Sequence, residues 1–372
     1  MKKVVVMFLM VFVLTGCMKN TTDNLKSFKD YNSKKESYEL TGVMKLISNE
    51  DEFTYDLKVG VKDNEFYKVS LVNTVSNHEQ VILKNSDGVY VITPNLNKSF
   101  RFQSEWPNNS SQAYLIGSLV DDLNKDSNAV IEEEKDNYII KAKVNYPNNA
   151  KLDNEVITTD KKFNITNVSV KDETGATILE VKINDINYSP KFNDEYFSLD
   201  NYITEESSND EKKEDDEKTK EEKKKKEESC ISECQEDENC KKNCTKDTET
   251  KNTSNILDEI IYPLYVPTDT YLSSKDTVTT DNGNRVILTF AGVDPFILVE
   301  EVSVKNKEME IIPVSGEPLL LGDSVGALTS NSLYWTSNGI DYYLTSNTLN
   351  SQDMMTIAES ITNSSSLVAK VK

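Results

Sequence analysis

Apolar residues recur at every second position over much of this 372-residue chain. The alternation is clearest in residues 53–61, 67–71, 138–144 and 179–183. Strict alternation predicts strands that have one apolar face and one wet face. Turn-forming pairs such as Asp87-Gly88 and Thr174-Gly175 separate the apolar runs, as in hairpins. We therefore expect one long antiparallel sheet in the first half of the chain.

One helix interrupts this pattern. Residues 112–123 place Ile116, Leu119, Val120 and Leu123 on a single stripe, as an amphipathic helix does. Roughly eight or more predicted strands would then share one apolar face, with one or two helices to cover it. A sheet of this kind must curl on itself, pack against a partner or enclose something apolar.

Aromatic and aliphatic side chains gather around this helix and the two short strands before it. Ordinary core packing explains such a cluster, and so does the lining of a cavity that holds an apolar ligand. We keep both interpretations open. The candidate lining residues are Tyr90, Ile92, Phe100, Phe102, Trp106, Ile116, Leu119 and Leu123.

The N-terminus has the layout of a lipoprotein signal peptide. Lys2 and Lys3 precede an apolar run over residues 4–14, which is too short to span a bilayer. The run leads into Leu14-Thr15-Gly16-Cys17, and a small residue before Cys17 is what a lipoprotein signal peptidase requires. We expect cleavage before Cys17 and acyl chains such as palmitate at the new terminus. They would hold the protein at the extracytoplasmic face of a bacterial cell membrane.

Charge and composition divide the rest of the chain. The net charge is 42 − 63 = −21, which argues against nucleic acid and against electrostatic docking on anionic lipid. We expect a signal peptide at 1–16, a lipidated tether and first helix at 17–36, and a half-barrel domain at 37–203. A charged linker follows at 204–254, and a small C-terminal α+β domain occupies 255–372. That domain closes with a helix whose buried stripe includes Met354, Ile357 and Ile361.

Four cysteines lie in the charged linker as two Cys-x3-Cys pairs. In two helices joined by a tight turn, Cys230 would pair with Cys244, and Cys234 with Cys240. An exported location favours such disulfides. Free or redox-active thiols and a zinc site are the alternatives, although the spacing is unusual for zinc and no His lies nearby.

No motif predicts catalysis, a metal or a cofactor. Gly322-Asp323-Ser324-Val325-Gly326 matches G-x-S-x-G, but a nucleophile elbow needs a preceding strand, a following helix and a His partner. The single histidine, His78, lies in the other half of the chain, in an expected solvated loop. We interpret Ser324 as a turn residue and the protein as non-enzymatic.

The stretch VYVITPNLNKSFRFQSEWPNNSSQAYLIGSLVDDL, residues 89–123, closely resembles the signature of Gram-positive sporulation and germination lipoproteins. These are lipoprotein-anchored relatives of the LolA family of outer-membrane lipoprotein carriers, and the resemblance covers roughly residues 20–203. It implies an incomplete, strongly curved antiparallel barrel with a helical lid. In the Gram-negative carriers the concave face of this barrel holds acyl chains.

The C-terminal residues 262–267, 333–336, 339–342 and 353–361 resemble a small domain of unknown function found after such modules. The two-domain order is similar to that of periplasmic regulators of envelope stress. A germination lipoprotein of this type activates a cortex-modifying amidase by binding it. The cysteine-bearing charged insert between the domains departs from the family pattern.

Two functions follow as hypotheses. The first is the binding of a lipid or a lipoprotein acyl chain in the half-barrel. The second is control of an envelope enzyme of the amidase type, or of a signalling protein, by direct binding in the cell envelope.

Overall fold

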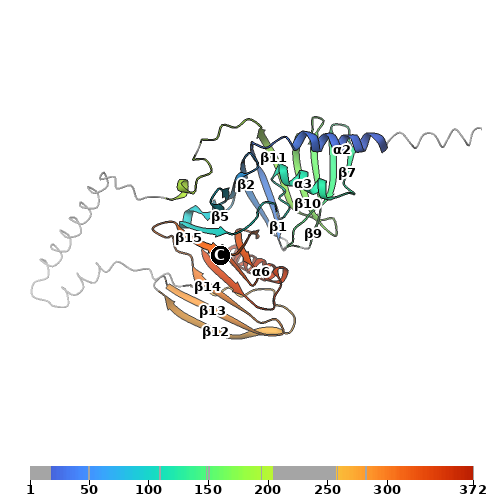
Figure 1. Cartoon of the computed structure of the whole chain (residues 1–372). Helices are drawn as coiled ribbons and strands as arrows, with labels where there is room; N and C mark the ends of the chain where they lie inside the picture. The colour runs from blue at the N-terminus through green and yellow to red at the C-terminus, as the bar shows by residue number, and fades with distance from the viewer. Residues whose placement is uncertain are drawn as a thin grey trace, which may run out of the picture.

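The computed structural model describes residues 18–48, 51–108, 110–147, 149, 151–193, 195–203, 257, 259–280 and 283–371. Two sheets make up most of it (Figure 1). The signal peptide, Cys17 and the four linker cysteines lie outside the described residues.

The larger sheet has twelve strands, in the order β15-β6-β5-β4-β3-β2-β1-β11-β10-β9-β8-β7. Its two end strands do not pair with each other, so the curved sheet stays open, and the predicted fold class is confirmed. Eleven of the strands come from the N-terminal half: β1 (Tyr38–Ser48), β2 (Asp51–Lys62), β3 (Phe66–Asn73), β4 (Glu79–Asn85), β5 (Gly88–Thr93), β6 (Lys98–Phe102), β7 (Val130–Glu133), β8 (Asn137–Lys143), β9 (Leu152–Asp160), β10 (Ile165–Asp172) and β11 (Thr177–Asn187).

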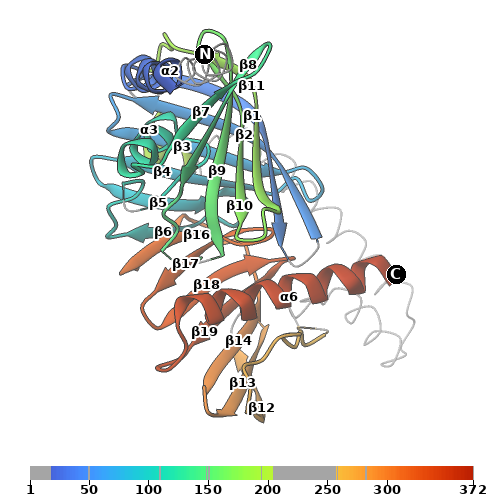
Figure 2. The ribbon, with the colours of Figure 1, turned by 90° about the vertical axis from the view of Figure 1, so that its right-hand side faces the viewer.

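Two helices lie on the concave side of this sheet, α2 (Met18–Asn32) and α3 (Ile116–Lys125) (Figure 2). Helix α3 begins four residues later than the sequence predicted, because Leu115 has an extended backbone. The Tyr38 hydroxyl, on β1, accepts a hydrogen bond of 3.0 Å from the Ile116 amide. This bond satisfies one of the free amides at the helix start and fixes α3 against the sheet.

The smaller sheet has seven strands, in the order β12-β13-β14-β19-β18-β17-β16. Helix α6 (Ser351–Val371) packs across one of its faces (Figure 2). The predicted start of this helix is confirmed, since Asn350 Oδ1 accepts a hydrogen bond from the Asp353 amide. The strands are β12 (Thr270–Thr280), β13 (Gly283–Gly292), β14 (Phe296–Val302), β16 (Gly316–Leu320), β17 (Val325–Thr329), β18 (Ser332–Ser337) and β19 (Ile340–Thr345).

The two halves are joined by a strand as well as by side chains. Strand β15 (Glu310–Val314) leaves the C-terminal half and pairs in parallel with β6 of the N-terminal sheet. Beside it, Lys98 forms a 2.8 Å ion pair with Asp341. Gln80 binds the Val325 backbone twice, accepting from its amide at 2.6 Å and donating to its carbonyl at 3.2 Å. The predicted domain limits stay predictions, but the two halves share one sheet.

A segment that we call the aromatic strap, residues 192–202, covers the convex face of β3–β5. Phe192, Tyr196, Phe197, Leu199 and Tyr202 belong to it and pack against Val81, Leu83, Tyr90 and Ile92. It contains a short 3-10 helix, Leu199–Tyr202. Another 3-10 turn, Pro94–Leu96, connects β5 to β6. The large sheet is therefore buried on parts of both faces.

Candidate functional site

The structure divides the eight candidate lining residues between two faces of the sheet. Tyr90 and Ile92 lie on the convex face, under the aromatic strap. Neighbouring residues of β5, Val89 and Val91, point to the concave face because side chains alternate along a strand. The other six belong to the concave core: Phe100, Phe102, Trp106, Ile116, Leu119 and Leu123.

The chain's own groups cover much of the concave face. Helices α2 and α3 contribute buried side chains such as Phe28 and Leu119 to its core. The C-terminal half adds Val314, Val325 and Ala327 to the same core. The apolar face that the sequence predicted is thus largely satisfied by packing within the molecule.

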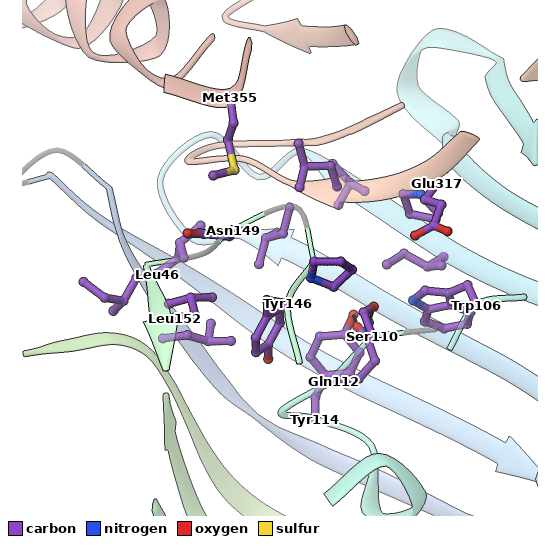
Figure 3. A pocket seen from close by; sticks show the side chains of 18 of the residues that line it. Leu46, Trp106, Ser110, Gln112, Tyr114, Tyr146, Asn149, Leu152, Glu317 and Met355 are labelled. Atoms are coloured by element: carbon purple, nitrogen blue, oxygen red, sulfur yellow. Dashed lines mark hydrogen bonds between the residues drawn. The ribbon is translucent and has the colours of Figure 1, made fainter. Parts of the chain in front are cut away.

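An apolar crevice remains where the two halves meet (Figure 3). Its floor comes from the N-terminal half, and the facing wall comes from β16 and α6. Its volume is about 110 Å³. Its apolar lining is Leu46, Ile47, Leu71, Ile82, Trp106, Tyr114, Tyr146, Pro147, Leu152, Ile178, Leu179, Pro318, Leu319, Leu320, Val325 and Met355.

The size of the crevice limits what it can hold. Pockets for drug-sized ligands are typically about 300–1,000 Å³, whereas an engineered cavity of about 150 Å³ holds one benzene molecule. The crevice therefore matches a single apolar side chain or the end of a longer apolar group. It does not match a whole acyl chain.

Polar side chains also line the crevice. Gln112 is held by two bonds, donating to Ser110 Oγ at 2.8 Å and accepting from the Tyr114 hydroxyl at 2.7 Å. Two carboxyl groups, Glu317 and Glu359, line the crevice on the C-terminal side. Burial raises the pKa of Glu359, and nearby Lys151 acts against that increase.

Two buried carboxyl groups lie in the core beside the crevice residues Tyr114 and Tyr146. Asp122, on α3, is 3% exposed and Glu155, on β9, is 1% exposed. Burial raises the pKa of Asp122 to about 6 and the pKa of Glu155 well above its usual value. The two charges also disfavour each other. Both effects favour the protonated, neutral form of Glu155, which avoids an unpaired charge in the core.

His78 and Ser324 come closer together than the sequence suggested. Both line a cavity of about 80 Å³ at the junction, together with Asp323. Strand β17 follows Ser324, so the strand-turn-helix of a nucleophile elbow does not form there. No hydrogen bond joins Ser324 to His78 among the described side chains. The predicted role of Ser324 as a turn residue is consistent with this geometry.

Neither a metal site nor a spanning helix is found in the described parts of the chain. Residues 18–203 and 257–371, apart from the gaps given above, contain no group of three or more His, Cys, Asp or Glu side chains that could hold a metal ion. Within the same residues no helix is long and apolar enough to cross a bilayer. The predictions about Cys17, Cys230, Cys234, Cys240 and Cys244 concern residues outside the description.

The sequence reasoning missed most of the crevice. Its wall in the C-terminal half, including Leu319 and Met355, lies more than a hundred positions away from its floor in the sequence. Tyr146 and Leu152 flank Asn148-Asn149, which is a turn-forming pair in the sequence. Their apolar character next to that turn was the available signal.

One known protein is similar to almost the whole chain. No family model matches the sequence. The chain is 32% identical to the sporulation protein YdcC of Bacillus subtilis over 363 residues, which cover 96% of this chain and 95% of that protein. The match therefore extends over both halves.

Some solved structures match about half of the chain at low identity. A LolA superfamily protein, NE2245 from Nitrosomonas europaea, covers 49% of this chain and 99% of its own, with 12% identity and a TM-score of 0.29. The complex of the CwlD amidase from Clostridioides difficile with the GerS lipoprotein covers 45% of this chain and 95% of the matched chain. Here the identity is 17% and the TM-score is 0.28.

Proposed function

Because the chain belongs to the family of the Bacillus subtilis sporulation protein YdcC, we propose that it is a non-enzymatic envelope lipoprotein that acts in sporulation by binding another protein. The partner is an envelope enzyme or a signalling protein. The binding site is the apolar crevice at the junction of the two halves. Cys17 carries the lipid anchor and holds the protein at the extracytoplasmic face of the cell membrane.

One observation carries this proposal, namely the filling of the concave face by the chain itself. Val314, Val325 and Ala327 of the C-terminal half lie in the concave core, and a crevice of about 110 Å³ remains beside them. Protein interfaces commonly place one large apolar side chain in a well-packed pocket of that kind. A crevice built from both halves also links binding to the way the halves dock.

Binding of an acyl chain is the second candidate. The crevice lining is aliphatic and aromatic, and Ile47 at its edge is 38% exposed. The end of an acyl chain would suit these side chains. The volume favours a protein side chain, because a whole acyl chain needs a pocket of several hundred Å³.

A photo-crosslinking amino acid at position 47 tests the site. We expect it to form an adduct of defined mass with one envelope protein in sporulating cells. The same amino acid in place of Val130, which is 48% exposed on β7, is the matched control and should form no such adduct. Equal crosslinking at both positions would show that the crevice is not the contact.

Native mass spectrometry of residues 18–372 separates the two candidates. We expect a mass without bound lipid after gentle purification. A lipid that stays bound and is released on denaturation would support acyl-chain binding and overturn the protein-partner proposal, as would a crosslink at position 47 that reaches only lipid.

A further inference from the structure

The cavity lined by His78 and Ser324, which we call the junction cavity, is a second space beside the apolar crevice. Its volume is about 80 Å³, and Leu71 lines both spaces. One side comes from β2 to β5 and the turns between them, including Tyr55 and His78. The other side comes from two turns of the C-terminal sheet, with Asp323 and Ser324 in the first.

The two carboxylate oxygens of Asp323 differ in their hydrogen bonding. The Ser337 hydroxyl donates to Asp323 Oδ2 at 2.6 Å. Asp323 Oδ1 is buried and makes no hydrogen bond of good geometry with the described residues. The Ser324 hydroxyl and the Asp323 amide lie near the carboxylate and lower its pKa. Ser324 is 3% exposed, and its Oγ also lacks such a bond within the described chain. The Tyr55 hydroxyl beside them donates to the Gly322 carbonyl at 2.6 Å.

Asp323 is ionised at neutral pH, because burial raises its pKa only to about 6. No Lys or Arg among the described residues forms an ion pair with it. Its pKa is lowered most by the hydrogen bond from Ser337, and less by the exposed His78 and the Ser324 hydroxyl. The neighbouring carboxylate Asp341 differs, since it is paired with Lys98 at 2.8 Å. A buried charge without a partner is costly, and a cation in this cavity would remove that cost.

We propose that the junction cavity binds the guanidinium or ammonium group of a basic side chain from the partner protein. Asp323 Oδ1 and Ser324 Oγ supply acceptors for its N–H groups. Leu71 and Leu96 supply apolar surface for its methylene groups. This inference rests on the proposed function in taking the source of the cation to be a protein that docks at the same junction.

His78 makes the site directly measurable, because it is the single histidine of the chain. Methylguanidinium chloride and methylammonium chloride are titrated separately into residues 18–372 at a constant pH of 7.5. Sodium chloride at matched ionic strength is the reference. We expect a saturable shift of the His78 ring signals in the NMR spectrum, and the cation that saturates at lower concentration identifies the preferred group.

Asp323→Asn should weaken the binding of the probe at least tenfold. The matched control is Asp56→Asn, because Asp56 is exposed on β2 beside Tyr55 and loses the same charge. If Asp323→Asn does not fold, Ser324→Ala replaces it and should weaken binding several-fold. A shift that sodium chloride reproduces, or one that survives both variants, overturns the proposal.

The outcomes separate this inference from the proposed function. Saturable binding of the probe together with a lipid-only crosslink at position 47 would support the cation site and reject the protein partner. A protein crosslink without binding of the probe would support the partner and reject the cation site.

Discussion

At the scale of single residues, the unusual feature is the number of buried carboxyl groups. Asp122 and Glu155 lie in the N-terminal core, and Glu300 lies in the C-terminal core. Burial raises the pKa of each, to about 7 for Glu300. The Ile261 amide donates a 3.1 Å hydrogen bond to Glu300 and lowers this pKa only in part. These groups make folding depend on pH.

We predict that the protein becomes more stable as the pH falls from 8 to about 5. The folded chain keeps protons on Asp122 and Glu300 at pH values where the unfolded chain releases them. The contribution of these two groups to stability is fully present below their unfolded pKa values near 4, and it is lost as the pH rises through about 6 to 7. Thermal unfolding followed by circular dichroism across this range measures the effect. A melting temperature that rises steadily towards pH 8 would contradict it.

Asp122→Asn should raise the melting temperature at pH 8 and flatten its dependence on pH. The substitution removes a charge that costs about 3 kcal/mol to keep in the core, because burial raises the pKa of Asp122 to about 6. Asp136→Asn is the control, because Asp136 is exposed in the turn before β8. An equal change in both variants would assign the effect to net charge alone.

At the scale of elements, the aromatic strap closes the convex face that the alternating strands leave apolar. Phe197 packs against Phe192 and Tyr196, with ring centroids 5.0 and 4.8 Å apart. The Asn85 side chain donates to the Phe197 carbonyl at 3.1 Å. A Cβ at Gly60 would lie 2.7 Å from the Tyr196 ring, so the strap needs glycine there. The strap is thus part of the folded core and not a loose end of the domain.

Phe197→Ala should lower the free energy of unfolding by about 3–5 kcal/mol, as expected for a large aromatic side chain in a core. Chemical denaturation measures the change. Tyr271→Ala is the control, because Tyr271 is 63% exposed on the edge strand β12, and it should change stability by less than about 0.5 kcal/mol. Similar losses in the two variants would show that the strap adds nothing to the core.

At the scale of the whole molecule, backbone and side-chain contacts join the two halves. Strand β15 extends the N-terminal sheet, and Gln80 binds both backbone groups of Val325. Tyr334 of the C-terminal half also packs against Phe100, with ring centroids 6.1 Å apart. Residues of both halves line the apolar crevice and the junction cavity, so a ligand in either space touches both halves.

Gln80→Ala should weaken the docking of the two halves by about 1–3 kcal/mol, because it leaves the Val325 amide and carbonyl without partners. We expect the single thermal transition to broaden or split in calorimetry. Gln103→Ala is the control, since the Gln103 side chain is exposed. A sharp, unchanged transition in Gln80→Ala would show that other contacts alone hold the halves together.

The sequence by itself determined the strands and the closing helix, whereas the curved open sheet was implied by the resemblance of residues 89–123 to sporulation lipoproteins. Alternating residues such as Tyr67, Val69 and Leu71 specify a strand locally, and Asn350 marks where α6 starts. What only the tertiary structure decided is which face each apolar residue occupies and which distant residues meet. Alternation separates Tyr90 and Ile92 from Val89 and Val91, but it does not tell which pair faces the concave side.

The sequence pattern likewise does not show which residues meet at the junction of the two halves. Gln80 and Val325 are 245 positions apart, and no local pattern marks either as a partner of the other. The contact of β15 with β6, the apolar crevice and the junction cavity all depend on such pairs. Local periodicity reports the surroundings of a residue within its own strand or helix, whereas the packing of one half on the other is set by the shape and hydrogen bonding of complete surfaces.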